Sequence, residues 1–331
     1  MRFFPILIIL FLCIACSQDS DTEEVPFSDV EVEILFSPSG FGDSGYNDII
    51  LYGIRQSCKK YGFKLTMRRP HSVDKGWELY EDWRRKASED RKQLFIFASN
   101  EYEQLLRAVP PTQQPNKSIL LFEAAEGIEH VAAFRLEMYG AAYYLGRLVA
   151  NTVSSAAILL PNRADQNLKR CLDGFKEGYL ETNGILDFGE YYLADNIGQG
   201  YNMPDSAYRM AYVMFQDYSF VFPVAGGSNN GVLRYTREYP RGIYTAGVDG
   251  DMSGFSTRVL ASLVKRIDWV IEQYIANWLK GETMDGFVSY GLDSDFIEVV
   301  IADNYKAFYE PILQGLEEKA IKREQHYVEQ Y

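Results

Sequence analysis

Short apolar runs alternate with amphipathic stretches along most of the chain. The apolar runs predict strands at residues 31–36, 63–67, 94–97, 118–122, 156–160, 188–193, 219–222 and 242–248. The amphipathic stretches predict helices at residues 48–61, 136–152, 166–183, 204–216 and, as one long helix, 256–280. Strands that alternate with helices form parallel sheets whose faces are covered by the helices. The pattern therefore predicts an α/β fold.

The chain is too long for a single hydrophobic core. Its sequence has 331 residues, and cores stop growing at roughly 250–300 residues, beyond which chains divide into domains. We therefore expect two lobes. The body shows neither heptads nor short repeats, which would indicate a coiled coil or a solenoid.

The N-terminal segment has the features of an export signal. Arg2 precedes an apolar run over residues 3–15, and roughly 13 apolar residues are too few for a membrane span of about 20. The run ends in a sequence that resembles a bacterial lipobox, Leu12-Cys13-Ile14-Ala15-Cys16. We predict a signal peptide over residues 1–15 and a lipoprotein acylated at Cys16, with palmitate among its chains. Cleavage after Ala15 without lipidation is the alternative.

The segment over residues 16–29 is acidic and has no periodicity, which is typical of a flexible tether. Several acyl chains, at about 0.8 kcal/mol per buried CH₂, would hold the tether stably on a membrane. In many Gram-negative bacteria, an acidic residue directly after the lipidated cysteine resembles an inner-membrane retention signal, and this chain has Ser17 at that position. The acidic residues after Ser17 resemble surface-export signals of some lipoproteins. We therefore expect a place in the bacterial cell envelope, at the outer membrane or cell surface.

Composition disfavours several classes of function. The formal net charge of −13 argues against binding to nucleic acid or to anionic lipid. Beyond the N-terminal segment only Cys58 and Cys171 remain, and two distant cysteines form no disulfide framework. The histidines, His71, His130 and His326, show no metal-ligand spacing. We expect neither a metal nor a cofactor.

A glycine-rich loop connects the first predicted strand to the first predicted helix, with the sequence Gly40-Phe41-Gly42-Asp43-Ser44-Gly45-Tyr46-Asn47-Asp48. Such a loop lies at the carboxyl end of a strand, where open α/β sheets bind small ligands. Asp43 and Asn47 offer polar groups, and Phe41 or Tyr46 offers a flat ring for stacking. Asp43 and Asn47 also suit helix capping, and Tyr46 also suits a core.

The same loop matches the dinucleotide-binding fingerprint in the form Gly40-x-Gly42-x-x-Gly45. That fingerprint places a pyrophosphate at the helix N-terminus and requires an acid about 20 residues further along for the ribose. Near that distance the chain has Arg68 and Arg69, which suit only a 2′-phosphate. Asp43 would repel a pyrophosphate. A dinucleotide site is therefore disfavoured.

Two later loops also follow predicted strands. Gly226 and Gly227 follow the strand at 219–222, and Asp249 and Asp251 follow the strand at 242–248. Strand ends that converge from two lobes form a cleft, which is the usual place for a small ligand. An acid beside glycine at a strand end rarely serves packing, whereas Asp251 also suits a helix cap.

Several motifs occur in order along nearly the whole mature chain, at residues 42–47, 139–146, 174–179, 226–227, 247–251 and 262–268. Together they resemble the basic membrane protein family, which includes the purine nucleoside receptor lipoproteins and has the type I periplasmic-binding-protein fold. The resemblance implies two Rossmann-like lobes with parallel sheets, joined by a three-strand hinge. We assign residues 30–134 and 249–279 to lobe 1, residues 135–248 and 280–317 to lobe 2, and residues 318–331 to a C-terminal tail.

The resemblance also implies roles for single residues. Tyr46 or Phe41 would stack on a purine base, and Asn47 would read an edge of that base. Asp249 would bind the ribose hydroxyls, and Lys265 would add a donor beside them. One hydrogen bond to a charged group contributes roughly 1.5–3 kcal/mol and one stacking contact about 1–3 kcal/mol. A carboxylate bidentate to a diol makes two such hydrogen bonds, and together with one stack they can approach micromolar binding, about −8 kcal/mol, for a nucleoside or for a sugar.

Three functions remain open from the sequence. The first is a non-enzymatic binding protein that delivers a nucleoside to an ABC-type importer. The second is a surface protein of the same fold with a changed ligand or a sensory role. The third is a nucleoside or glycoside hydrolase that uses the carboxylates Asp43, Asp249 and Asp251. The hydrolase is disfavoured because the chain has no convincing nucleophile–base set.

Overall fold

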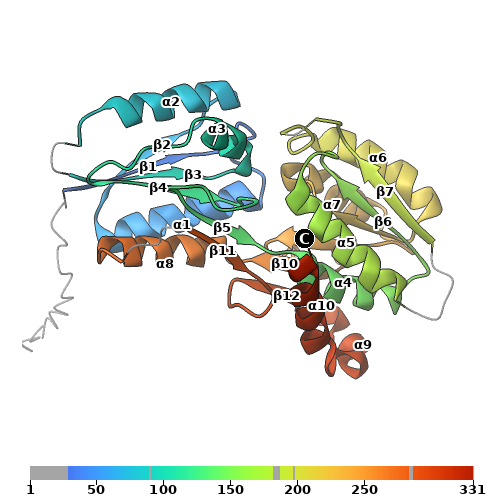
Figure 1. Cartoon of the computed structure of the whole chain (residues 1–331). Helices are drawn as coiled ribbons and strands as arrows, with labels where there is room; N and C mark the ends of the chain where they lie inside the picture. The colour runs from blue at the N-terminus through green and yellow to red at the C-terminus, as the bar shows by residue number, and fades with distance from the viewer. Residues whose placement is uncertain (1–28, 89–90, 182–186, 197, 283–285, 331) are drawn as a thin grey trace, which may run out of the picture.

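The chain folds into two α/β lobes, each built on a six-stranded sheet (Figure 1). The computed structural model describes residues 29–88, 91–181, 187–196, 198–282 and 286–330. The predicted signal peptide, Cys16 and the tether before residue 29 lie outside the described residues. The α/β class with parallel sheets is confirmed.

The sheet of the first lobe has the strand order β11-β5-β4-β3-β1-β2, and all its neighbouring strands are parallel. Its strands are β1 (Val30–Leu35), β2 (Lys64–Arg68), β3 (Lys92–Phe97), β4 (Lys117–Phe122), β5 (Ala132–Leu136) and β11 (Gly286–Tyr290). One face carries α1 (Tyr46–Tyr61) and α8 (Ile267–Leu279), and the other carries α2 (Val73–Arg85) and α3 (Glu103–Ala108) (Figure 1). The central strands β3 and β4 end in apolar runs, Leu94–Phe97 and Ile119–Phe122, because both faces of the sheet are buried there.

The sheet of the second lobe has the strand order β12-β10-β9-β8-β6-β7. Its strands are β6 (Ser155–Leu160), β7 (Asp187–Tyr192), β8 (Phe220–Pro223), β9 (Tyr244–Asp249), β10 (Val259–Lys265) and β12 (Ile297–Ile301), of which β12 is antiparallel to β10. Its helices are α4 (Tyr139–Ala150), α5 (Gln166–Leu180), α6 (Pro204–Asp217) and α7 (Asn229–Glu238). The chain ends in α9 (Asp303–Leu313) and α10 (Leu316–Gln330), and α10 packs on α4.

The helices α4 and α5 cross at unusually close range. A Cβ atom on Gly178 would lie 2.1 Å from the carbonyl oxygen of Tyr143, and one on Gly174 would lie 2.2 Å from that of Tyr139. Only glycine permits this approach, because real Cβ atoms do not come so near to backbone oxygen. The glycine motif at residues 174–179 therefore has a packing role.

Three connections cross between the lobes, from β5 to α4, from β10 to α8 and from β11 to β12. The described strands therefore match the expected three-strand hinge. The single long helix predicted over residues 256–280 is wrong, because Val259–Lys265 forms strand β10. All seven residues of that strand are buried, so the apolar run carries no surface periodicity that could mark it as strand or helix. The predicted lobe limits place β10 in lobe 1 and β11 in lobe 2, whereas β10 pairs in the second sheet and β11 in the first.

One buried carboxylate ties the C-terminal helix to two of these connections. Glu324 of α10 accepts hydrogen bonds from the backbone N–H groups of Gly140 and Leu292, each at 2.7 Å. Gly140 is the second residue of α4, just after the connection from β5, and Leu292 lies in the connection from β11 to β12. The segment predicted as a C-terminal tail is thus a packed helix that contacts the hinge.

Candidate ligand-binding site

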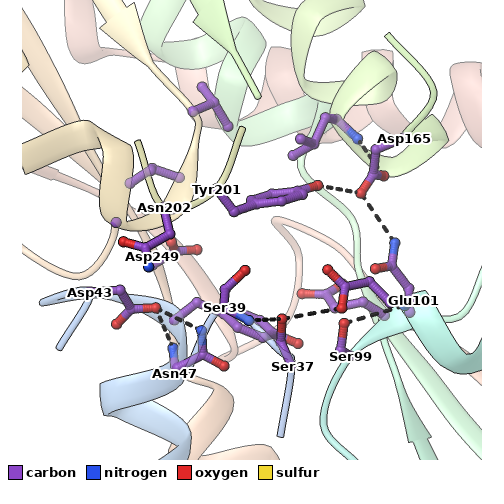
Figure 2. Close-up of a pocket in the computed structure, with 18 of the residues that line it drawn as sticks. Ser37, Ser39, Asp43, Asn47, Ser99, Glu101, Asp165, Tyr201, Asn202 and Asp249 are labelled. Carbon is purple, nitrogen blue, oxygen red and sulfur yellow. Dashed lines mark hydrogen bonds between the residues drawn. The ribbon is translucent and has the colours of Figure 1, made fainter. Parts of the chain in front are cut away.

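A cavity lies between the two lobes at the carboxyl ends of their strands. The space within its walls, with the open solvent at the mouth included, is about 900 Å³. Lobe 1 contributes the loops after β1, β3 and β4, and lobe 2 contributes the loops after β6, β8 and β9 and the loop before α6. Figure 2 shows polar side chains from both lobes pointing into this space.

All but one of the residues predicted from the sequence for the site line this cavity, namely Phe41, Asp43, Tyr46, Asn47, Gly226, Gly227, Asp249 and Lys265. Asp251 is exposed and is not part of the lining. Its carboxylate accepts a hydrogen bond of 2.9 Å from the N–H group of Ser253, so it closes a turn. Ligand binding by the lining residues stays a prediction.

Asp43 holds the glycine-rich loop in place. Its carboxylate accepts hydrogen bonds from the backbone N–H groups of Gly45, Asn47 and Asp48 and from the side-chain amide of Asn47, at 2.8 to 3.2 Å. Four donors occupy most of the capacity of one carboxylate. Asp43 therefore caps the start of α1, and the loop presents its neighbours to the cavity.

Two polar atoms of this loop are buried without a hydrogen-bond partner in the described structure. They are the side-chain oxygen Oδ1 of Asn47 and the hydroxyl oxygen of Tyr46. An unsatisfied buried polar atom costs about 1–3 kcal/mol. Both residues line the cavity, so a bound ligand can supply the missing partners.

Aromatic rings enter the cavity from both lobes. Tyr46 lies with its ring centroid 5.4 Å from Nζ of Lys265, and burial raises its pKa well above the ordinary value. Phe41 packs edge-on against Phe36, with ring centroids 4.6 Å apart. Tyr201 enters from the loop before α6 and donates its hydroxyl hydrogen bond to Asp165 at 2.6 Å (Figure 2). Aromatic residues from both lobes therefore line the cavity.

Asp249 ends strand β9 in an uncommon backbone conformation. Its φ angle is +70°, in the left-handed region, and only 7% of the residue is exposed. Burial is the main cause that raises the pKa of its carboxyl to about 6, with Lys265 opposing and Asp43 and Glu123 adding to the rise. Strain and burial of this kind cluster at functional sites.

Lys265 lies between two buried carboxylates. Its Nζ donates a hydrogen bond of 2.9 Å to Oε1 of Glu123 and lies 3.7 Å from Oδ1 of Asp249. Burial lowers the pKa of Lys265, but the carboxylates of Glu123 and Asp249 outweigh it, and the net change is upward. At 3.7 Å the contact to Asp249 is too long for a hydrogen bond. The Asp249 carboxylate is therefore held in place and can still accept hydrogen bonds from a ligand.

The lobes touch around the cavity through three asparagine amides. Asn100 donates to Oδ2 of Asp165 at 3.2 Å and Asn167 donates to the carbonyl oxygen of Glu123 at 2.7 Å. The third bond, of 3.2 Å, runs from the side-chain amide of Asn230 to the carbonyl oxygen of Asp43. The structure therefore has the two lobes closed on each other.

Several lining residues were not predicted from the sequence, namely Ser37, Ser99, Asn100, Glu101, Glu123, Asp165, Asn167, Tyr201 and Asn202. Most of them follow β1, β3, β4 or β6, so the rule that strand ends face the ligand would have found them. Tyr201 and Asn202 lie far from any strand end in the sequence. No local pattern marks their position.

Two further features are relevant to the class of protein. Among the described residues no group of three or more His, Cys, Asp and Glu side chains is arranged to hold a metal ion. In the same part of the chain, no helix combines the length and the apolar character needed to cross a membrane.

Two α/β lobes, three crossings and a cavity between the lobes define a type I periplasmic-binding-protein-like solute-binding protein. The sequence model of the family described as ABC transporter substrate-binding protein PnrA-like (Bmp) matches residues 30–329, and the chain belongs to this family. The resemblance to the basic membrane protein family is thereby confirmed. The family is extracytoplasmic and non-enzymatic, and membership implies a small-molecule ligand and an ABC permease as partner.

Solved structures support the fold. An ABC transporter solute-binding protein from Aeropyrum pernix K1 is 19% identical, with a TM-score of 0.70 over 91% of this chain and 86% of that chain. A transcriptional activator of the comK gene from Bacillus halodurans is 13% identical, with a TM-score of 0.65 over 90% and 97%. GanP, a glucose-galactose binding protein from Geobacillus stearothermophilus, is also 13% identical, with a TM-score of 0.58 over 83% and 98%. Among curated proteins none matches the chain.

Proposed function

We propose that the cavity binds a purine nucleoside and that the protein presents it to an ABC importer. The observation that carries the proposal is the buried group of Asp249, Lys265 and Glu123. Within it, the Asp249 carboxylate accepts no hydrogen bond from Lys265, and both residues face the cavity. A vicinal diol fits such a group because its hydroxyls can donate to the carboxylate and accept from the ammonium.

The loop after β1 supplies the second half of the binding site. Tyr46 or Phe41 stacks on the base, as the family resemblance implies, and Tyr201 covers the opposite side from lobe 2. The unpartnered Oδ1 of Asn47 accepts a hydrogen bond from an N–H group of the base. Stacking at about 1–3 kcal/mol and two hydrogen bonds from a diol to the Asp249 carboxylate, at roughly 1.5–3 kcal/mol each, sum to about 4–9 kcal/mol, which supports affinity near the micromolar range.

We further propose that Cys16 is acylated and anchors the protein at the outer membrane or cell surface. The lipobox-like residues before Cys16 and the acidic segment after it support this placement. Metabolic labelling with a palmitate analogue tests it. Label in the wild type and none in Cys16→Ala is expected, and equal labelling of both would contradict the anchor.

A hydrolase that uses the same carboxylates is disfavoured. Asp43 is engaged by four N–H donors, so its carboxylate is held as a capping acceptor and is unsuited to transfer protons. The second candidate is a binding protein for a sugar, because a sugar also offers vicinal hydroxyls to Asp249. The rings of Tyr46 and Tyr201 favour the nucleoside over the sugar only through stacking.

Thermal unfolding of the full-length protein with nucleosides, free bases and hexoses tests the proposal. A ligand at 100 times its dissociation constant stabilises the native state by about 2.7 kcal/mol. We expect a shift with purine nucleosides that Asp249→Ala abolishes and that the exposed Asp251→Ala retains. A rise in the unfolding temperature with hexoses alone would favour the sugar. Free base found in the incubation with nucleosides would indicate a hydrolase.

A further inference from the structure

The end of the cavity opposite Asp249 has its own chemistry. Figure 2 shows Asp249 at one end of the space and Glu101 with Asp165 at the other. Glu101 follows β3 in the short helix Asn100–Tyr102 and projects toward lobe 2.

The acceptor oxygens of Asp165 are already occupied. Its Oδ1 accepts from the N–H groups of Asn167 and Leu168, as the cap of α5. Its Oδ2 accepts from the hydroxyl of Tyr201 at 2.6 Å and from the amide of Asn100 at 3.2 Å. Asp165 therefore serves the closed arrangement of the lobes and has little capacity left for a ligand.

Glu101 is not saturated in this way. Its Oε2 accepts one hydrogen bond of 3.2 Å from the hydroxyl of Ser37. Within the described residues no donor reaches its Oε1, and a Cβ atom on Gly198 of lobe 2 would lie 3.4 Å from that oxygen. The loop of lobe 2 thus lies against Glu101, which is half-buried, and the Glu101 carboxylate lines the cavity.

Among the described residues, no lysine or arginine forms an ion pair with the Glu101 carboxylate. Lys265 is the only lysine or arginine among the described residues that line the cavity, and it is engaged by Glu123 and Asp249. Burial is the main cause that raises the pKa of Glu101 to about 7; Ser37 opposes the rise and Asp165 adds to it. A ligand that brings N–H donors to this position satisfies the carboxylate, whereas one that brings an oxygen acceptor is repelled.

We propose that Glu101 is a specificity-determining acceptor that selects a ligand whose ring edge carries two adjacent N–H donors. This inference rests on the proposed nucleoside function, since the sugar end of the ligand would lie at Asp249. Among purines, the donor pair is the N1–H and 2-amino edge of guanine. A carboxylate accepts such a pair with one oxygen for each N–H group.

Calorimetric titration of the full-length protein with guanosine, inosine and xanthosine tests the inference. The three ligands share the ribose and the 6-oxo purine ring and differ at position 2, which carries an amino donor, a hydrogen atom or an oxygen acceptor. Xanthosine differs also at N3, which is deprotonated at pH 8, so its ring carries a negative charge that the Glu101 carboxylate repels. At pH 8, where Glu101 is ionised, we expect guanosine to bind about 10- to 100-fold more tightly than inosine, because one hydrogen bond to a charged group is lost. Xanthosine should bind more weakly than inosine.

The variant Glu101→Gln should reduce the guanosine preference to within about threefold and bring xanthosine to at least the affinity of inosine, because the glutamine amide can donate to the 2-oxo group. Ratios between ligands on one variant do not depend on how much of it is folded. The control Asp251→Asn should leave the order of the three ligands unchanged.

Two results would overturn the inference alone. One is the absence of a guanosine preference in the wild type, seen as equal affinity for guanosine and inosine or as binding of adenosine only. The other is a guanosine preference that Glu101→Gln preserves. In either case nucleosides still bind and the proposed function stands. If no nucleoside binds the wild type, the proposed function fails and the inference fails with it.

Discussion

Asp249→Asn should make the ligand-free protein more stable, although it removes the central ligand contact. The folded-state pKa of this carboxyl is about 6, raised from 3.8 mainly by burial. About two pKa units at 1.36 kcal/mol each correspond to a cost of roughly 3 kcal/mol for keeping the carboxylate ionised. Asparagine has no charge and also suits the left-handed backbone at φ +70°. At pH 8 we expect a gain of about 1–3 kcal/mol.

The pH dependence follows from the direction of the shift. Because the pKa of Asp249 is raised in the folded state, its contribution to stability is fully present below pH about 4 and is lost as the pH rises through about 6. The gain from Asp249→Asn should therefore shrink to about half at pH 5. Urea unfolding of the ligand-free protein at pH 5 and pH 8 measures both values.

Asp43→Asn is a matched control for which we expect the free energy of unfolding to change in the opposite direction. The Asp43 carboxylate accepts from four N–H donors, and an amide has one oxygen acceptor in place of two. We expect this variant to lose about 1–3 kcal/mol at pH 8. The reasoning is refuted if Asp249→Asn destabilises the protein, if its gain is the same at both pH values, or if both variants shift stability in the same direction.

Two further predictions concern the packing of α4 on α5 and the contact of α10 with the hinge. Gly178→Ala places a Cβ atom 2.1 Å from the carbonyl oxygen of Tyr143, whereas Gly254 faces open space. We expect Gly178→Ala to lower the free energy of unfolding by about 1–3 kcal/mol or more, because the two helices must move apart. Gly254→Ala should leave it nearly unchanged, and urea unfolding measures both. Glu324→Ala leaves two backbone N–H groups of the hinge unpaired. It should cost about 2–5 kcal/mol in the same assay, against no measurable change for the exposed Glu318→Ala. Equal effects of a variant and its control would contradict either prediction.

The sequence predicted the α/β class and most strands because apolar runs of four to eight residues are bounded by clear turns. It failed at β10, since a run buried on every side has the same pattern in a strand and in a helix. It also missed β5 (Ala132–Leu136), where Arg135 interrupts the apolar run. That arginine is buried and pairs with Glu137 at 3.2 Å, a compensation that only the fold supplies.

The cavity was predicted in part for a similar reason. Gly226, Gly227 and the loop after β1 carry a glycine signal that marks a strand end in the sequence. Glu101 and Asp165 carry no such glycine signal, and in the sequence only their place after a strand points to them. Asp249 and Asp251 are alike in sequence, but only Asp249 faces the cavity, because the turn after β9 directs Asp251 to solvent.

The central claim is that Asp249 and Lys265 bind the vicinal hydroxyls of a purine nucleoside. Calorimetric titration of the full-length protein with guanosine and with 2′,3′-dideoxyguanosine tests it most directly, since the two ligands differ only in the ribose diol. We predict micromolar or tighter binding of guanosine, near −8 kcal/mol, and at least a tenfold loss for the dideoxy compound. Equal affinity for both ligands would contradict the claim, and so would the failure of every purine nucleoside to bind.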